Sequence, residues 1–172
     1  PELSVNEAEE VVLRFAPNPN GPLSIGHSRG VVINSEFAKI YSGKIILRFD
    51  DTDTKIKPPL PSAYSSIEDE FEWISGVKPD VVIRASSRMD VYLEHAEKMI
   101  SQGFCYVCKC PAPRFKSLRD KMLACPCRDN SVEVNLNQWK MMIHGKIEEG
   151  KSVVRVKTGL DLPNPALRDW PA

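Results

Sequence analysis

The chain has 172 residues, 42% of them hydrophobic, and its 23 Lys and Arg residues are balanced by 23 Asp and Glu residues. The length allows one sizeable domain, or one core with an inserted module, and the balanced charge excludes a protein that attracts nucleic acid over its whole surface, so any RNA contact needs a local basic patch. Because the sequence has neither an apolar run of membrane length nor a signal-peptide pattern, we expect a cytoplasmic protein without membrane contact.

The chain begins with an acidic, weakly patterned segment, Pro1–Glu10, which we interpret as a linker. The first residue is not Met, and the last residue, Ala172, follows soon after a motif. We therefore also expect the chain to be a piece excised from a longer protein.

Residues 11–53 are predicted to form a strand–loop–helix–strand unit. Val11–Phe15 is apolar and β-branched, as in a buried strand, and three prolines exclude regular structure from the loop Ala16–Ser24. A helix capped by Gly43 follows, and Lys44–Phe49 returns as a second strand. Such a unit has parallel strands and a right-handed crossover. The apolar face of the helix is predicted to contain Val32 or Ile33, Phe37, Ile40 and Tyr41.

Both loops of this unit leave the carboxyl ends of parallel strands, where ligands bind in open parallel sheets. The helix is expected to begin near Gly26, and its free N–H groups and positive dipole end favour a phosphate. His27 can donate a hydrogen bond to that phosphate. Asp50 follows the second strand and is placed to face a cationic group of a ligand across the same crevice. Alternatively, His27 only starts the helix, and the aspartates at 50, 51 and 53 are solvated or cap turns, as we expect of Asp53.

The alternation of strands and helices continues to Gly103. Ser62 is the predicted N-cap of a helix that ends at Gly76, Val81–Ile83 is a third strand, and Met89–Ile100 is a further helix with His95 in the core. This βαβαβα order predicts an α/β fold class, with residues 11–103 as the first half of a doubly wound, Rossmann-like parallel sheet. The apolar face of the helix after Ser62 is predicted to contain Tyr64, Ile67, Phe71 and Ile74.

From Phe104 the sequence becomes rich in cysteine, proline and basic residues, which predicts an inserted α+β module over residues 104–172. Helices are expected over Pro113–Met122 and Val132–Ile143, and a half-exposed strand over Ser152–Lys157. His144 precedes a helix-ending glycine, where it is placed to compensate the helix dipole.

Four of the five cysteines form two Cys-x-Cys pairs, Cys108 with Cys110 and Cys125 with Cys127. A disulfide within such a pair is strained, whereas the two pairs together offer four thiolates for tetrahedral zinc. Four protein ligands leave no open position, so the predicted metal is structural. Two alternatives to this site are that the thiols are free, or that Cys105 pairs with Cys108 instead.

Basic residues gather around these cysteines, and only Asp120 opposes them. Beside a zinc site this pattern predicts contact with RNA phosphates, and a solvated helix face is the alternative. The predicted RNA-binding residues are Arg114, Lys116, Arg119, Lys121 and Arg128, with Lys109 beside them.

Four motifs resemble one enzyme family. RFAPNPNGPLSIGH and GKIILRFDDTDT resemble the first signature block of the class I glutamyl- and glutaminyl-tRNA synthetases, and CRDNSVE and NPALRDWPA resemble the archaeal-type glutamyl enzyme. The resemblance covers nearly the whole chain from Val11. It departs at Ser24, where the family signature His-Ile-Gly-His has its first histidine; serine can hydrogen-bond a phosphate but carries no charge.

The resemblance implies a glutamate–tRNA ligase that uses ATP and Mg²⁺ to form glutamyl-adenylate and transfers the glutamyl group to the 3′ end of tRNA(Glu). It assigns catalysis to Ser24 and His27, and it assigns residues 104–172 to the tRNA acceptor stem. The glutamate-binding residues implied by the resemblance are Arg14, Ala16 and Asp50. The ATP-binding residues are Asn18, Pro19, Asn20, Ser24, Ile25, Gly26, His27, Ser28, Arg29 and Gly30.

Arg14 lies inside the first predicted strand, where a charge needs a partner. It is expected to pair with a strand-end aspartate, to grip the side-chain carboxylate of glutamate, or to do both. The family's second signature, a lysine-containing loop, is absent from these residues, so the chain alone is predicted to be inactive. Glutaminyl or relaxed specificity, a nucleotidyltransferase acting on a metabolite, and a non-catalytic zinc-bearing RNA-binding module are the alternatives.

Overall fold

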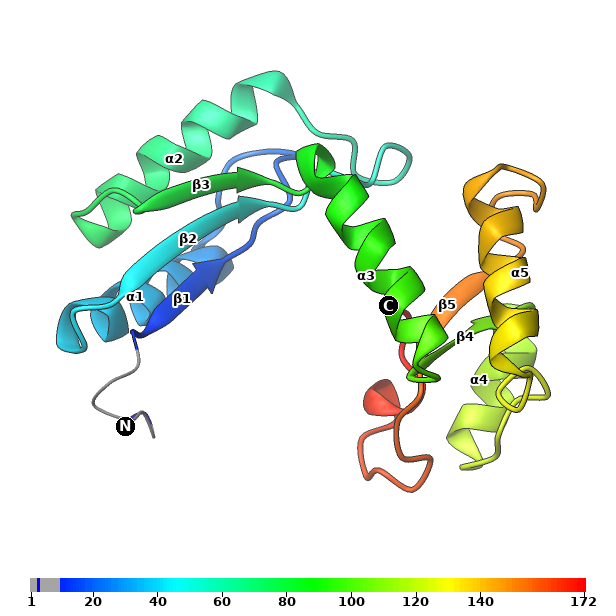
Figure 1. Ribbon diagram of the computed structural model, residues 1–172. Helices are drawn as coiled ribbons and strands as arrows, with labels where there is room; N and C mark the ends of the chain where they lie inside the picture. The colour runs from blue at the N-terminus through cyan, green and yellow to red at the C-terminus, as the bar shows by residue number, and fades with distance from the viewer. Residues whose placement is uncertain (1–2, 4–9) are drawn as a thin grey trace. The chain divides into compact units, whose positions relative to one another are not determined.

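The computed structural model of the protein describes residue 3 and residues 10–172 (Figure 1). The predicted linker, Pro1–Glu10, therefore lies mostly outside the described residues. No helix within the described part is long and apolar enough to cross a membrane.

The chain divides into two compact units between Met89 and Asp90. This division precedes the predicted module boundary at Gly103 because Ile100, in the helix before that glycine, is fully buried in a core of the second unit. The assignment of residues 11–103 and 104–172 to two functional modules stays a prediction.

The first unit contains a three-stranded sheet in the order β1-β2-β3, formed by β1 (Val12–Phe15), β2 (Lys44–Phe49) and β3 (Val81–Arg84). Both strand pairs are parallel. The three predicted strands and the α/β class with a parallel sheet are thus confirmed. Phe15 lies opposite Leu47, which places the ends of β1 and β2 at the same edge of the sheet.

One face of this sheet is covered by α1 (Ile25–Ile40) and α2 (Pro61–Ser75). Side chains alternate along each strand, so every second residue enters the core beneath the helices, while Val12 and Arg14 lie exposed on the other face. The predicted apolar face of α2 is confirmed. Fully or largely buried core residues of this unit are Phe15, Val31, Ala38, Ile45, Leu47, Phe49, Ala63, Ile67 and Phe71.

Two predicted helix ends in this unit are wrong. Helix α2 begins at Pro61 with Leu60 as N-cap, rather than after Ser62; proline suits the first helical position because its φ is already helical and the missing N–H has no partner there. Gly43 is not the left-handed residue at the end of α1, since Ser42 takes the positive φ of 49°, although the Gly43 N–H donates to the Ala38 carbonyl oxygen in the last turn over 2.9 Å. A Cβ at Gly43 would lie 2.3 Å from the Val11 carbonyl oxygen, so glycine is required there for close approach to the first strand.

The predicted apolar face of α1 is also partly wrong. The buried residues of α1 are Val31, Ser35 and Ala38, whereas Ile33 and Ile40 are exposed. Only small or short side chains fit between the α1 backbone and the sheet, and the bulky residues on the flanks of the helix are left outside.

The second unit is built around an antiparallel pair, β4 (Cys105–Cys108) and β5 (Val153–Val156), with α3 (Met89–Ser101), α4 (Ala112–Asp120) and α5 (Val132–Ile143). The three predicted helices and the strand at β5 are confirmed. The sequence pattern does not predict β4, because all four of its residues are buried and no alternation marks it.

The two faces of β4 belong to different cores. Cys105 and Val107 pack with Ile100 and Trp139, and Tyr106 and Cys108 face Phe115 of α4. The prediction that β5 is half-exposed, with its basic residues outside, is wrong at Arg155, which is 9% exposed. Its guanidinium lies 3.3 Å from the centre of the Phe115 ring, a cation–π contact that makes burial of the charge tolerable.

The two remaining histidines lie on helices of the second unit. His95 is exposed, with Nδ1 2.8 Å from the Val91 carbonyl oxygen, so its assignment to the core is wrong; α3 packs instead through Leu93 and Ala96. His144 ends α5, and its Nδ1 lies 2.7 Å from the Lys140 carbonyl oxygen, which agrees with its predicted place at the helix end.

Candidate functional site

The loop before α1 is held against the end of β2 by hydrogen bonds. The Asp50 N–H donates to the Pro17 carbonyl oxygen over 2.9 Å, and the Asn18 side-chain amide donates to the Asp50 carbonyl oxygen over 3.0 Å. At the end of the loop, the Leu23 N–H donates to Glu70 of α2 over 2.6 Å. These bonds fix the start of α1 at the carboxyl edge of the sheet.

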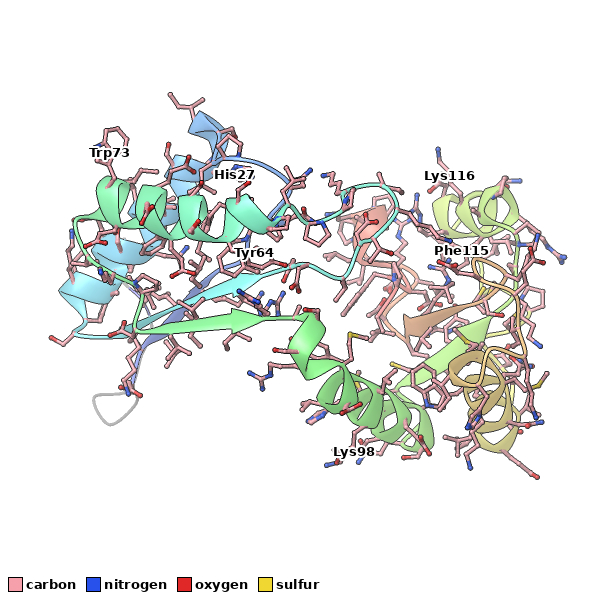
Figure 2. All side chains as sticks on the ribbon, turned by 90° about the horizontal axis from the view of Figure 1, so that it is seen from above. His27, Tyr64, Trp73, Lys98, Phe115 and Lys116 are labelled. Atoms are coloured by element: carbon pink, nitrogen blue, oxygen red, sulfur yellow. The ribbon has the colours of Figure 1, made fainter. Side chains whose placement is uncertain are left out.

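Ser24 and His27 cap the first turn of α1. The Ser24 N–H donates to His27 Nδ1 over 3.0 Å, and the His27 N–H donates to the Ser24 carbonyl oxygen over 2.9 Å. Because Nδ1 accepts a hydrogen bond, the neutral imidazole carries its proton on Nε2. His27 is exposed at the start of α1 (Figure 2), and its ring makes a T-shaped contact with Phe15, with 6.5 Å between the ring centroids. The site therefore holds an oriented donor at the helix N-terminus.

The first backbone N–H groups of α1 stay available for a ligand. Among the described residues, none accepts a hydrogen bond from the N–H of Ile25 or Gly26, and both residues are exposed. Free donors at the positive end of a 16-residue helix are a suitable site for phosphate oxygens. The start of α1 thus brings the free N–H groups of Ile25 and Gly26 close to the His27 side chain.

Two predicted ATP-binding residues have internal roles. Asn18 uses its amide nitrogen on the Asp50 carbonyl oxygen, and its Oδ1 is buried without a partner among the described residues. A Cβ at Gly30 would lie 3.2 Å from the Phe15 ring, so this glycine allows α1 to pack closely on β1. Both residues support the loop and helix that carry the exposed donors.

Two of the three aspartates after β2 are structural. Asp51 is buried and accepts hydrogen bonds from the Ser86 N–H, the Ser86 hydroxyl and the Tyr64 hydroxyl, over 2.7–2.9 Å. Burial disfavours its charge, but these bonds outweigh burial and lower the pKa of Asp51. Asp53 accepts from the N–H groups of Lys55 and Ile56, which confirms its predicted turn role and lowers its pKa.

Asp50 is partly exposed, with 42% of its side chain accessible. Arg48 holds its carboxylate with a fork of two bonds, Nε to Oδ1 over 2.7 Å and Nη2 to Oδ2 over 3.1 Å. Arg48 is not among the predicted site residues, although residues i and i+2 share a strand face and this spacing was a usable signal. The alternative of an Arg14 ion pair with a strand-end aspartate is wrong, because Arg14 has no ion pair among the described residues and Arg48 occupies Asp50.

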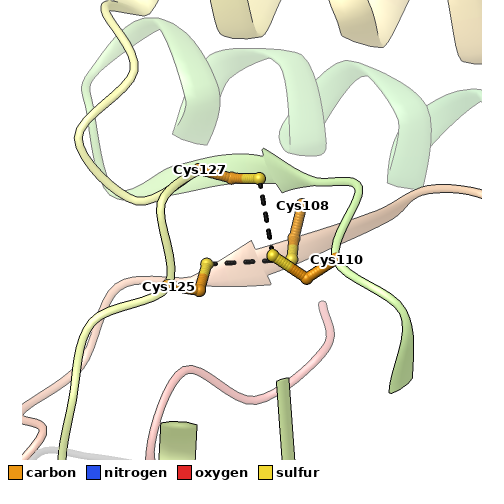
Figure 3. A group of neighbouring side chains, drawn as sticks. All are labelled: Cys108, Cys110, Cys125 and Cys127. Atoms are coloured by element: carbon orange, nitrogen blue, oxygen red, sulfur yellow. Dashed lines mark hydrogen bonds between the residues drawn. The ribbon is translucent and has the colours of Figure 1, made fainter. Parts of the chain in front are cut away.

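The second unit gathers the four predicted cysteines (Figure 3). All four sulfur atoms lie within 4.8 Å of one another, and the Cys108–Cys125 and Cys110–Cys127 sulfur distances are both 3.8 Å. A tetrahedral zinc site with Zn–S bonds of about 2.3 Å has sulfur–sulfur edges of about 3.8 Å, so the residues fit this metal. The rival pairing of Cys105 is wrong, because Cys105 points to the opposite face of β4.

Burial raises the pKa of the Cys108 thiol and raises that of Cys110 to about 12. At Cys125 burial acts in the same direction, but its hydrogen bonds with the Tyr106 hydroxyl, the Cys127 N–H and neighbouring thiols prevail and lower its pKa. A raised pKa keeps the Cys108 and Cys110 thiols protonated at neutral pH, and a metal ion bound here would deprotonate the cysteines and balance the charge of the resulting thiolates.

The predicted basic surface is partly present around α4. Arg114, Lys116 and Lys121 are exposed, and Figure 2 shows Lys116 beside the inward-facing Phe115. Arg119 contacts Asp120 over 3.0 Å. The prediction that Arg128 binds RNA is corrected, because its guanidinium pairs with the buried Asp169 and donates to the Thr158 carbonyl oxygen.

Comparison with known proteins identifies relatives along the whole chain. The family model "tRNA synthetases class I (E and Q), catalytic domain" matches residues 10–170. The glutamate–tRNA ligase of Pyrococcus horikoshii is 51% identical over 172 residues, which are 100% of this chain and 30% of that protein. The ligase of Methanosarcina mazei is 51% identical over 166 residues, 96% of this chain and 29% of that protein.

A solved structure is also similar. The crystal structure of a glutamate tRNA ligase from Elizabethkingia meningosepticum, in complex with its amino acid, matches with a TM-score of 0.58 and 25% identity. It covers 86% of this chain and 32% of that protein. The chain thus spans about 30% of the length of the relatives it matches.

Proposed function

Because the chain belongs to the family of class I tRNA synthetases for glutamate and glutamine, we propose that it supplies the ATP- and glutamate-binding part of a cytoplasmic glutamate–tRNA ligase. Its three-stranded sheet is then one half of a doubly wound, Rossmann-like sheet. The reaction joins glutamate to ATP as glutamyl-adenylate and moves the glutamyl group to the 3′ end of tRNA(Glu). A glutaminyl enzyme is not favoured, since the relatives are named glutamate–tRNA ligases.

The exposed start of α1 carries this proposal. Its free N–H groups at Ile25 and Gly26, together with His27 Nε2, are placed to hold phosphate oxygens of ATP. The α-carboxylate of glutamate attacks the α-phosphorus and pyrophosphate leaves, so the protein needs no nucleophile of its own. The protein contributes positioning and stabilisation of negative charge, and Mg²⁺ would neutralise part of the phosphate charge.

On the amino-acid side, Asp50 is proposed to accept the glutamate ammonium group. Each carboxylate oxygen has two lone-pair sites, so the fork from Arg48 leaves acceptor capacity on the exposed part of Asp50. Arg14 is exposed on the sheet face that the helices leave open, which suits contact with the side-chain carboxylate of glutamate. Ala16, the next residue after β1, has a methyl side chain that leaves room for the amino acid.

In the second unit, the four clustered cysteines are proposed to hold a structural zinc ion, and the surface around it to contact the tRNA acceptor stem. The exposed residues Arg114, Lys116 and Lys121 supply positive charge. A cavity of about 490 Å³ beside Cys108 is also lined by Lys109 and Lys151. Phosphates of RNA are the ligands that such a local concentration of cations favours.

The nucleotide site is tested by titrating the protein with Mg²⁺-ATP while recording amide NMR spectra. We expect the largest shifts at Ile25, Gly26 and His27, and we expect His27→Ala to weaken binding several-fold. Val132→Ala, an exposed change at the start of α5 in the second unit, serves as the control. Shifts confined to residues outside the loop and α1 would overturn the proposed site.

The RNA surface is tested with Lys116→Ala against Lys98→Ala, two exposed lysines on α4 and α3 of the same unit (Figure 2). For an acceptor-stem minihelix RNA, we expect Lys116→Ala to weaken binding and to reduce the slope of log K against log salt by about 0.9, the value of one lost phosphate contact. Lys98→Ala is expected to change neither. Equal effects of the two variants would contradict a specific surface around α4.

A further inference from the structure

The buried carboxylate of Asp169 lies at the centre of the second unit's polar contacts. Its side chain is almost inaccessible, with 1% of the residue exposed, and the residue has a positive φ of 44°. Its Oδ2 accepts from the Tyr106 hydroxyl over 2.8 Å, and its Oδ1 accepts from the Thr158 N–H over 3.1 Å and from the Arg128 guanidinium. A buried charge with this many donors is fully satisfied.

The donors come from both halves of the cysteine site. Tyr106 precedes Cys108 by two residues on β4, so the two side chains share one face of the strand. Arg128 directly follows Cys127. The Tyr106 hydroxyl also lies 3.4 Å from Cys125 Sγ. One carboxylate therefore connects the segment that carries the first Cys-x-Cys pair to the segment that carries the second.

Asp169 is itself held by the last described segment of the chain. Its N–H donates to the Thr158 hydroxyl over 2.8 Å, and its carbonyl oxygen accepts from Arg155 of β5 over 3.1 Å. The neighbouring Trp170 carbonyl oxygen accepts from the Val156 N–H over 3.0 Å. Residues 158–170 and the cysteine site thus share one hydrogen-bond network.

We propose that Asp169 is a positioning residue for the metal site: its carboxylate, through Tyr106 and Arg128, holds the two Cys-x-Cys segments at the spacing that a tetrahedral ion needs. This inference rests on the proposed zinc site and deepens it. Because binding free energies are reciprocal, the metal also stabilises the docking of residues 158–170. Partners that orient metal ligands typically contribute 10–100-fold to metal affinity.

The first test measures zinc affinity by competition with a chromophoric chelator, using the whole chain. Asp169→Asn suits it because asparagine tolerates a positive φ, keeps the size of the side chain, removes the charge and replaces one acceptor oxygen with an NH2 donor. We expect a 10–100-fold weaker zinc affinity for Asp169→Asn and a smaller loss for Tyr106→Phe. The matched control is Asp51→Asn, which changes a buried carboxylate that likewise accepts from a tyrosine hydroxyl, Tyr64, in the first unit. Its zinc affinity is expected to equal that of the unchanged protein.

The second test needs no variant and so does not depend on the folding of one. Hydrogen exchange of the unchanged protein is followed with and without zinc. We expect removal of zinc to accelerate exchange at the N–H groups of Thr158 and Asp169, while peptides from α1 keep their rates. Unchanged exchange at Thr158 and Asp169 would overturn the coupling.

The outcomes separate the two proposals. If the unchanged protein takes up no stoichiometric zinc, the proposed metal site fails. If it binds zinc and Asp169→Asn binds it equally well, the metal site stands and the positioning role of Asp169 is overturned. Weaker binding by Asp169→Asn but not by Asp51→Asn supports the positioning role.

Discussion

The two units of this chain are stabilised in different ways. In the first unit, a parallel sheet and two helices enclose one continuous apolar cluster in which Leu47, Ile67 and Phe71 are fully buried. In the second unit, a two-stranded sheet separates two smaller clusters, and the one around Phe115 is made partly of cysteine side chains. A small core of this kind rarely supplies enough burial on its own and is supplemented by metals or polar networks.

Each unit also contains a buried aspartate that accepts from a tyrosine hydroxyl. Asp51 has only neutral donors, Tyr64 and Ser86, and ties β2 to the residues after β3. Asp169 has a cationic donor, Arg128, and connects segments far apart in the chain. A buried carboxylate thus reinforces an apolar core in one unit and connects the two Cys-x-Cys segments in the other.

The largest expected effect is that of removing the proposed zinc ion. Structural zinc contributes on the order of 10 kcal/mol to the folding of small zinc-bearing domains, so chelation is expected to unfold the second unit and leave the first folded. Hydrogen exchange resolved by peptide distinguishes the units: peptides of β4 and α5 should lose protection, and peptides of β2 and α2 should keep it. Equal loss in both units would contradict the difference drawn between them.

The complementary experiment weakens the apolar core of the first unit and leaves the second unit unchanged. Phe71→Ala removes a fully buried ring from the first unit and is expected to reduce its free energy of unfolding by about 3–5 kcal/mol. The control is Trp73→Ala, two residues along the same helix, where the ring is 85% exposed (Figure 2) and a change within about 0.5 kcal/mol is expected. Protection of peptides from α5 should be the same in both variants, and the measurement is denaturant-dependent hydrogen exchange.

The first unit was largely predictable from sequence because its signals are local. Strand runs such as Lys44–Phe49, the apolar spacing of α2 and the glycine at 76 each report on neighbours a few residues away. The two wrong helix ends have different causes: Leu60 is an unusual N-cap, and Gly43 is required by a contact that is distant in sequence, with Val11 just before β1. The irregular loop before α1 was predicted because its three prolines exclude a helix or a strand there.

The second unit was less predictable because its key contacts are distant in sequence. Tyr106 and Asp169 are 63 residues apart, and the segment around Asp169 has no periodicity that marks its burial. Strand β4 is buried on both faces, so it lacks the alternation of apolar and polar residues that marks a half-exposed strand. Its cysteines predicted a metal site, but the strand itself was not predicted. The charge of Arg128 suggested RNA, and only the fold reveals its buried partner.

The smallest expected effect concerns acid stability of the first unit. The pKa of Asp51 is lowered in the folded protein, since the bonds from Ser86 and Tyr64 outweigh burial. Its stabilising contribution is therefore complete above the ordinary pKa of an aspartate, and it disappears as the pH falls through the lowered, folded-state pKa.

Asp51→Asn, which removes a charged acceptor, is expected to cost about 1–3 kcal/mol at neutral pH. The difference from the unchanged protein should shrink as the pH falls through that window. Tyr64→Phe removes one of the three donors and should give the same trend with a smaller amplitude. Urea unfolding of the first unit at a series of pH values measures both variants. If the cost of Asp51→Asn stays constant into acid, the charge of Asp51 does not stabilise this unit. The Asp51 network would then act as a set of neutral hydrogen bonds, unlike the charged network around Asp169.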